Sequence, residues 1–198
     1  MRAITANIFL TLDGVMQAPG RPDEDTRGGF RHGGWGAAYS DAVMMKEMTA
    51  DMGKGGAGAM LFGRRTYMDF FSVWPGRKDN PFSPVLDRAQ KYVVSRTLKE
   101  PLPWKNSTLL SGDAAVSVGE LRRGRGKDIV VLGSGELLQG LMRHDLVDRL
   151  VLLIHPLVLG EGRRLFATDR HSFPLRLTKT VPTTKGVIIA TYERAASE

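Results

Sequence analysis

Four short stretches of the chain place small, polar or cationic residues directly after apolar runs. They are Thr11–Gly14 (TLDG), Gly63–Thr66 (GRRT), Ser95–Thr97 (SRT) and Gly133–Glu136 (GSGE). Glycine lets a backbone approach a ligand closely, hydroxyl and amide groups offer hydrogen bonds, and guanidinium groups bind phosphate oxygens. Phosphate recognition is the chemistry that these residue types have in common.

The GSGE stretch joins an apolar run to a segment with helical spacing. Gly133 and Gly135 lack a Cβ atom and can adopt positive φ angles. The backbone amides of Ser134 to Leu138 would then face an anion at the positive end of a helix dipole. The pattern is not GxGxxG, because Leu138 stands where the third glycine would be, and a lone GxG corner is usually only a tight turn. A phosphate site and a simple turn both stay open.

Arginines strengthen the phosphate interpretation at two other junctions. Arg64 and Arg65 stand with Gly63 and Thr66 at an expected helix start, where cations oppose the helix dipole unless an anion offsets them. The alternative is that both arginines are ordinary surface cations. The pair Ser95–Arg96 repeats the pattern and could hold the extra phosphate that distinguishes NADP from NAD.

The remaining candidates carry less specific signals. Asp13 follows a strand in a TLDG turn and could face a substrate, although most Asp-Gly pairs only form turns. Trp35 could be a stacking surface or could pack in a satellite core. Asp41 could be a helix cap or a proton donor, and His155 before Pro156 is interpreted as structural. No histidine spacing predicts a metal site.

The elements that position these residues alternate between strands and helices and then become strands alone. We expect strands at Ala3–Leu10, Ala57–Phe62, Lys91–Ser95, Asn106–Leu110, Ile129–Leu132, Arg149–Leu153, Leu157–Leu159, Leu175–Lys179 and Gly186–Glu193. We expect helices at Asp41–Met52, Arg64–Phe71, Ser83–Gln90 and Glu136–His144, the first capped by Ser40 and ended by Gly53, Gly55 and Gly56. This order predicts an α/β fold in three layers, with a mainly parallel central sheet and an antiparallel C-terminal edge. Ligands of such sheets bind beyond the carboxyl ends of the strands.

Composition bounds the class of protein. The 198 residues suit one domain spanning 1–198, and 42% hydrophobic with 25% charged residues is ordinary for a globular chain. No apolar run approaches the ~20 residues of a membrane helix, and no signal peptide is expected. The absence of cysteine is compatible with the cytoplasm. The net charge of +7 favours anionic ligands, but no nucleic-acid-binding motif is present, and the basic run Arg122–Lys127 is interpreted as a solvated loop.

Taken together, the motifs resemble those of a known family. FLTLDGV, MLFGRRTY, KYVVSRTL and IVVLGSGELLQGLMRHDLVDRLVLLIHPLVLGEGRRLF are similar to segments of the dihydrofolate reductase-like family. Within it, the chain looks like stand-alone relatives of the C-terminal reductase domain of the riboflavin deaminase/reductase, from Ile4 to about Tyr192.

The resemblance implies NADPH as cofactor and a homodimer. By motif, Gly63, Arg64, Arg65 and Thr66 would hold the pyrophosphate and adenosine end, and Ser95 and Arg96 the 2′-phosphate. The pyrophosphate and nicotinamide ribose would meet a further set: Gly133, Ser134, Gly135, Glu136 and Leu137. Leu12, Asp13 and Gly14 would border the nicotinamide and the substrate, with Trp35 and Asp41 also on the substrate side. In true dihydrofolate reductases a carboxylate on the first helix protonates the pterin, for which Asp41 and Glu47 are candidates.

These expectations combine into one functional hypothesis. The chain is predicted to be an NADPH-dependent reductase of a small heterocycle, pteridine-like or ribosylaminopyrimidine-like, with no nucleic-acid or membrane partner. Asp13 is the first choice for proton delivery, with an acid on the first helix or bound water as alternatives, and the loop Gly14–Gly36 is a candidate mobile cover. The alternatives are a true dihydrofolate reductase, an NADPH sensor without turnover, a nucleotide-dependent transferase or hydrolase, and a nucleic-acid-binding module. The lack of a P-loop argues against the transferase or hydrolase.

Overall fold

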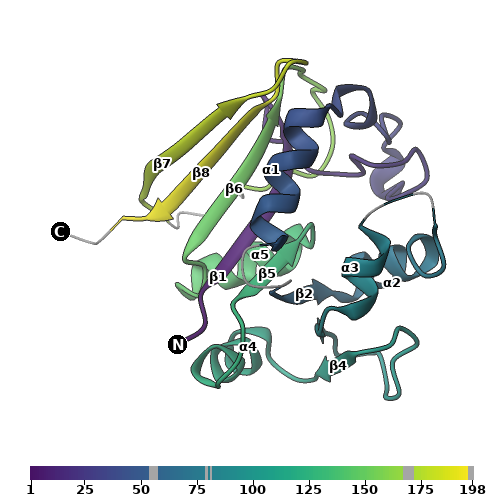
Figure 1. The fold of residues 1–198 in the computed structure, drawn as a ribbon, viewed down its shortest axis with the longest axis vertical. Coiled ribbons are helices and arrows are strands. Elements are labelled where there is room, and N and C mark those ends of the chain that lie inside the picture. The colour runs from purple at the N-terminus through teal and green to yellow at the C-terminus, as the bar shows by residue number, and fades with distance from the viewer. Residues whose placement is uncertain (54–57, 79, 81, 167–171, 196–198) are drawn as a thin grey trace. The chain divides into compact units, whose positions relative to one another are not determined.

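The computed structural model describes residues 1–53, 58–78, 80, 82–166 and 172–195 (Figure 1). The chain divides into two compact units. The first comprises Met1–Ala6 and Met52–Asp148, and the second comprises Asn7–Asp51 and Arg149–Glu198. Hydrogen bonds link the strands in the order β4-β3-β2-β5-β1-β6-β8-β7. Strand β1 (Ile4–Thr11) begins in the first unit and ends in the second.

The first unit is built on parallel strands whose carboxyl ends are level. Its strands are β2 (Ala59–Gly63), β3 (Lys91–Val94), β4 (Ser107–Leu110) and β5 (Ile129–Leu132). Strand β2 lies between β3 and β5, with Gly63 opposite Val94 and Leu61 opposite Val131. The first four residues of β2 are all buried, as expected of a parallel strand covered on both faces. The residues that follow β2, β3 and β5 therefore gather at one edge of this sheet.

Four helices accompany these strands: α2 (Arg64–Val73), α3 (Ser83–Arg88), α4 (Ala114–Arg123) and α5 (Gly135–Arg143). Helix α5 buries Leu138, Leu141 and Met142 along one face, which is the stripe expected of a helix that packs on a sheet. Helix α4 was not predicted from the sequence. Asp113 caps it by accepting hydrogen bonds from the amides of the second and third helical residues, at 2.9 and 3.1 Å.

The second unit pairs three antiparallel strands with one helix. Strands β6 (Arg149–His155) and β7 (Leu175–Pro182) flank β8 (Ile188–Arg194), which confirms the predicted antiparallel C-terminal strands. Helix α1 (Ala42–Gly53) covers one face of this sheet (Figure 1), where Met44 packs against Val151, Leu153 and Ile189. Apolar side chains on alternate strand positions thus form the core of this unit.

Several predicted element boundaries needed correction. Ser40 is not the cap of α1; the Asp41 carboxylate accepts the Met44 amide hydrogen bond at 2.8 Å instead. The segment Leu157–Leu159 is not a strand, because the chain turns at Pro156 and the Leu157 amide donates to the His155 carbonyl at 2.8 Å. Gly53 is the last residue of α1 as expected, whereas Gly55, Gly56 and the first predicted residue of β2, Ala57, lie outside the described residues.

Candidate functional site

The corners that follow β2 and β5 are joined by side-chain hydrogen bonds within the first unit. The Gly63 amide donates to Ser134 Oγ at 3.0 Å, and the Ser134 amide donates to Thr66 Oγ1 at 3.1 Å. Ser134 Oγ in turn donates to the Leu132 carbonyl at 3.1 Å. Two strand-to-helix corners that are 71 residues apart in sequence therefore form one structural feature, which we call the paired corners (Gly63–Thr66 and Gly133–Leu137).

Neither helix at the paired corners is capped by the side chain of its own N-cap residue. Gly63 has no side chain, and the Ser134 side chain makes no capping hydrogen bond to α5. The first-turn amides of a helix have no intrahelical acceptor, and the helix dipole makes this end attractive to anions. Two such helix starts in contact have the geometry expected of a pyrophosphate site.

The backbone of the GSG turn is left-handed at two successive residues. Gly133 has φ +54° and Ser134 has φ +53°, whereas Gly135 is already the first residue of α5. The predicted positive φ is therefore confirmed at Gly133, but the second residue with a positive φ is Ser134 and not Gly135. A Cβ atom at Gly133 would lie 3.3 Å from Thr66 Cγ2, so the absence of a side chain there lets the two corners approach.

The third junction, after β3, forms a hydroxyl-stabilised turn. Ser95 is buried, and its Oγ accepts hydrogen bonds from the amides of Thr97 and Leu98 at 3.1 and 3.0 Å. Arg96 beside it is exposed. The Ser95 hydroxyl is thus used within the chain and shapes the turn, and the Arg96 guanidinium is the group that this turn presents to solvent.

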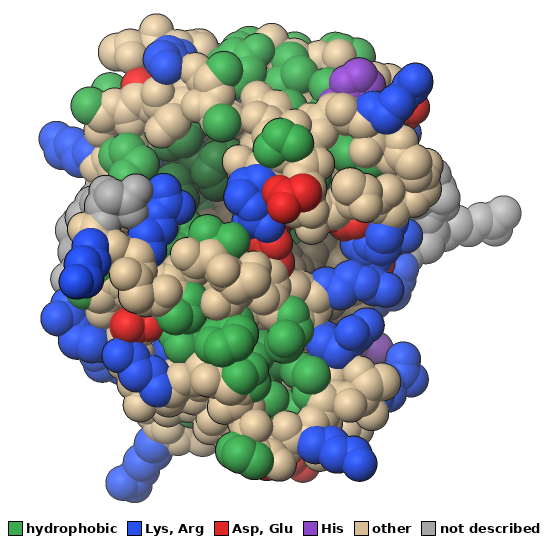
Figure 2. Space-filling view, turned by 90° about the vertical axis from the view of Figure 1, so that its right-hand side faces the viewer, with side chains coloured by type: hydrophobic (Ala, Val, Ile, Leu, Met, Phe, Trp, Pro, Cys, Tyr) green, Lys and Arg blue, Asp and Glu red, His purple; other side chains and the backbone are tan. Residues whose placement is uncertain are grey.

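The paired corners carry exposed cations. Arg64 and Arg65 are exposed, and Arg65 forms an ion pair with Glu136 Oε2 at 3.1 Å, in which both side chains are about half exposed. Exposed ion pairs of this kind contribute about 0–1 kcal/mol, so Arg65 can exchange Glu136 for a phosphate oxygen at little cost. Lys and Arg side chains are spread over the face of the molecule in Figure 2, in keeping with the net charge of +7.

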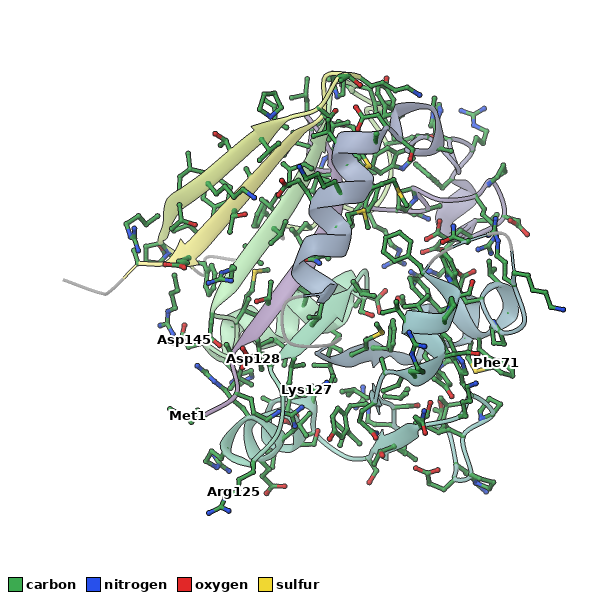
Figure 3. The ribbon with its side chains drawn as sticks, in the orientation of Figure 1. Met1, Phe71, Arg125, Lys127, Asp128 and Asp145 are labelled. Carbon is green, nitrogen blue, oxygen red and sulfur yellow. The ribbon has the colours of Figure 1, made fainter. Side chains whose placement is uncertain are left out.

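The basic run Arg122–Lys127 lies away from the paired corners at the other end of the strands. Arg122 and Arg123 end α4, and Arg125 projects outward from the turn that follows (Figure 3). The Arg122 guanidinium pairs with Asp148. The interpretation of this run as a solvated loop holds for Gly124–Lys127 only, because its first two residues are helical.

Asp13 in the second unit is held as a carboxylate by its neighbours. It accepts hydrogen bonds from Thr11 Oγ1 at 2.6 Å and the Gly160 amide at 2.9 Å, and Arg164 lies 3.3 Å away. The Thr11 hydroxyl above all, with the backbone amides of Gly160 and Leu159, lowers the pKa of Asp13 to about 2. A carboxyl group with this pKa carries no proton at neutral pH, so the geometry favours a positioning role over proton donation.

Two partners of Asp13 lie far from it in the sequence. Gly160 and Arg164, 147 and 151 residues further along the chain, belong to the LGEGRR segment, to which no local pattern assigns a role in the site. The Arg164 guanidinium also donates to the Asp13 carbonyl at 2.8 Å. The turn after β1 is therefore fastened to the loop after β6, and this contact required the structure to be found.

The loop Gly14–Gly36 has a small hydrophobic core of its own, and its role as a mobile cover stays a prediction. Val15, Ala18, Phe30 and Trp35 are all buried together, and Trp35 Nε1 donates to the Gln17 carbonyl at 2.7 Å. Trp35 therefore packs in a satellite core, which was the alternative to a stacking surface. An isolated antiparallel β-bridge between Val15 and Arg164 also holds the loop in place.

Leu12 and Gly14, the other predicted substrate-side residues of the TLDG turn, have accessible positions. Leu12 is 64% exposed, which leaves an apolar surface beside Asp13. Gly14 has φ +78°, and its amide closes the turn by donating to the Thr11 carbonyl at 2.9 Å. This turn therefore offers an apolar contact and a fixed carboxylate.

The two candidate acids of α1 are engaged in structural contacts. Asp41 caps the helix and accepts hydrogen bonds from Thr184 Oγ1 at 2.6 Å and the Lys185 amide at 3.2 Å. These bonds, the Met44 amide foremost, lower the pKa of Asp41 to about 2. Glu47 forms an ion pair with Lys179. Neither carboxylate is placed as a proton donor.

His155 is structural, as interpreted from the sequence. It is fully buried between Phe9, Trp35 and Tyr39, and its Nδ1 atom lies 2.9 Å from the Leu153 carbonyl. Because only carbonyl oxygens neighbour Nδ1, this nitrogen carries the proton of the neutral ring. Burial lowers the pKa of His155, which keeps the ring neutral.

Across the residues that the structure describes, no group of three or more His, Cys, Asp or Glu side chains could hold a metal ion. None of the helices in the described part of the chain is both long and apolar enough to cross a membrane.

The fold and the paired corners define a class of α/β protein with the dihydrofolate reductase-like fold, and comparison with known proteins agrees. Residues 2–189 match the model of the RibD C-terminal domain, and the chain belongs to this family. The uncharacterized protein YyaP of Bacillus subtilis (strain 168) is 30% identical over 139 residues, which are 67% of this chain and 72% of YyaP.

Solved structures share the fold at low sequence identity. A protein from Shewanella sp. PV-4 assigned to riboflavin biosynthesis has a TM-score of 0.68 and 21% identity, covering 98% of this chain and 99% of its own. A pyrimidine reductase-like protein from Corynebacterium diphtheriae has a TM-score of 0.65 and 15% identity, covering 99% and 93%. Dihydrofolate reductase from Enterococcus faecalis, complexed with NADP(H) and RAB-propyl, has a TM-score of 0.59 and 14% identity, covering 98% and 97%. Family and fold together place the chain among RibD C-terminal domain proteins with the dihydrofolate reductase-like fold.

Proposed function

We propose that this protein is an NADPH-dependent reductase that acts on a C=N or C=O bond of a small heterocycle. The observation that carries the proposal is the pair of uncapped helix starts joined through Ser134, with exposed arginines beside them. Membership in the RibD C-terminal domain family and the NADP(H) bound to the dihydrofolate reductase neighbour support the choice of cofactor.

The residues of the paired corners fit a dinucleotide. The pyrophosphate would accept hydrogen bonds from the first-turn amides that follow Gly63 and Ser134, with Arg64 and Arg65 balancing its charge. Glycine at 63 and 133 leaves no side chain over the corners. Glu136 would release Arg65 to the phosphate, and Gly135 and Leu137 would contribute backbone of the first turn. When bound, NADPH supplies the hydride, and the protein orients it and excludes water.

Arg96 is proposed to select NADPH over NADH. Its guanidinium is exposed on the turn that the Ser95 hydroxyl stabilises, two residues beyond the end of β3, where it could form a bidentate pair with a 2′-phosphate. Ser95 would then act by holding the turn rather than by touching the phosphate.

A pyrimidine-type substrate is better supported than a folate. Asp41 is a helix cap and Glu47 pairs with Lys179, so neither acid offers the proton that a pterin requires. Asp13 remains the predicted residue at the reacting end, where its ionised carboxylate would orient the substrate and solvent would deliver the proton. The exposed side chain of Leu12 would contact the apolar ring.

Two experiments on this protein test this function. Isothermal titration calorimetry with NADPH and NADH measures cofactor binding and preference. Absorbance at the reduced nicotinamide band, with a ribosylaminopyrimidine and with dihydrofolate, then separates the proposed reductase from a true dihydrofolate reductase. Tight NADPH binding without turnover of either substrate would instead indicate a sensor.

We further propose a cytoplasmic homodimer with no nucleic-acid or membrane partner. Sedimentation tests the dimer, and a DNA-binding assay at varied salt tests the absence of a nucleic-acid partner.

A further inference from the structure

Thr66 and Ser134 connect the paired corners through a closed set of hydrogen bonds. Thr66 Oγ1 accepts from the Ser134 amide at 3.1 Å, while Ser134 Oγ accepts from the Gly63 amide at 3.0 Å and donates to the Leu132 carbonyl at 3.1 Å. The Ser134 hydroxyl therefore both donates and accepts within the chain, which uses its proton and one of its lone pairs. Neither helix receives a cap from these side chains.

The same contacts hold a backbone conformation that serine does not favour. Ser134 has φ +53°, a left-handed conformation that is unfavourable for a residue with a Cβ atom. The bonds to Thr66 and Gly63 offset this cost, and the Thr66 methyl group fills the space above Gly133. Loss of the Thr66 hydroxyl would leave Ser134 free to relax to another backbone conformation and to turn the first amides of α5 away from those of α2.

We infer that Thr66 and Ser134 are positioning residues: they hold two helix starts in one orientation toward a single pyrophosphate and do not themselves bind it. The inference rests on the proposed function and changes the role that sequence resemblance implies for these two residues. The pyrophosphate is common to NADPH and NADH, so the cross-link should matter equally for both cofactors, unlike Arg96.

The test is a set of substitutions that remove or keep one hydroxyl. Thr66→Val keeps the shape of the side chain and loses the acceptor, Thr66→Ser keeps the acceptor, and Thr108→Val is a matched control. Thr108 lies on β4 and accepts a hydrogen bond from Gln90 Nε2 at 3.0 Å, apart from the corners. Dissociation constants for NADPH and NADH are measured by calorimetry, with thermal unfolding as the check on folding.

Thr66→Val should lose roughly tenfold in affinity for both cofactors, because the hydrogen bond between the Ser134 amide and Thr66, which fixes the two helix starts before the cofactor binds, is lost. Thr66→Ser and Thr108→Val should stay within about twofold of the wild type. The double variant Thr66→Val/Ser134→Ala should lose less affinity than the product of the two single losses, because the two hydrogen bonds that it breaks hold the same turn at Ser134.

Two results would overturn the inference. The first is wild-type cofactor affinity in Thr66→Val. The second is a double variant whose loss of cofactor affinity equals the product of the two single losses, which would show that Thr66 and Ser134 act independently of each other. If Thr66→Val does not fold, Ser134→Ala decides the matter: it keeps the Cβ atom that disfavours the left-handed backbone and removes the hydroxyl, so wild-type binding there refutes the cross-link. Failure of the wild-type protein to bind either cofactor would refute the proposed function instead.

Discussion

Substitution of Gly133 by alanine tests the backbone geometry of the paired corners. Its φ of +54° lies in the left-handed region, where a residue with a Cβ atom costs about 1–2 kcal/mol. The new Cβ atom would lie 3.3 Å from Thr66 Cγ2, a contact that is tight enough to displace Thr66 by a few tenths of an ångström. The free energy of unfolding should fall by about 1–2 kcal/mol, and the melting temperature by about 2–8 °C.

Gly112→Ala is the matched control for this substitution. Gly112 also lies in the first unit with a positive φ, +88°, but a Cβ atom there meets nothing within 4 Å. The control should lose similar stability and keep its affinity for NADPH, whereas Gly133→Ala should lose roughly five- to tenfold in affinity because Thr66 is displaced from Ser134. Urea unfolding and calorimetric titration measure the two effects. Equal NADPH affinity in the two variants would refute the reasoning.

Three further predictions concern ionisable groups. Asp13 has a pKa lowered to about 2, so its hydrogen bonds stabilise the folded protein above pH 4, and this contribution is lost as the pH falls toward 2. The difference in unfolding free energy between the wild type and Asp13→Asn, measured by urea unfolding, should therefore shrink over that range. A constant difference would contradict the low pKa of Asp13. Lys91 is fully buried against the Trp104 ring, and burial lowers its pKa to about 8. Between pH 8 and 10.5 only the unfolded state keeps the proton, so the unfolding free energy of the wild type relative to Lys91→Met should rise with pH. A fall in this difference would show that the lysine is charged when folded. Asp41→Ala removes the cap of α1 and should lower the unfolding free energy by about 0.5–2 kcal/mol, while the dissociation constant for NADPH should not change. Weaker NADPH binding in this variant would give Asp41 a role that its contacts do not indicate.

Local sequence predicted the paired corners, because each corner is a strand followed directly by a helix. The strand Ile129–Leu132 has the predicted bounds, and the apolar run before Gly63 became β2 with a shift of two residues at its start. Parallel strands bring their carboxyl ends to one edge, so the closeness of GRRT and GSGE followed from the fold class. The hydrogen bonds of Ser134 were not predictable, because the partners Gly63 and Thr66 are distant in sequence.

The predictions that failed or changed depended on distant partners or on weak local patterns. Asp41 caps α1 in place of Ser40, and its acidity depends on Thr184 and Lys185, 143 and 144 residues away. Helix α4 was missed although Asp113 is a good capping residue, since Gly119 interrupts its pattern. The Thr11 hydroxyl, two residues away, lowers the pKa of Asp13 most, but local spacing does not connect Asp13 to its other partners, Gly160 and Arg164.

Calorimetric titration of the wild type and Arg96→Ala with NADPH and NADH tests the central claim most directly. We expect the wild type to bind NADPH more tightly than NADH, and Arg96→Ala to lose this preference with its NADH affinity little changed. Absence of binding by either cofactor, or equal affinities in the wild type, would contradict the assignment of the paired corners and Arg96 to NADPH.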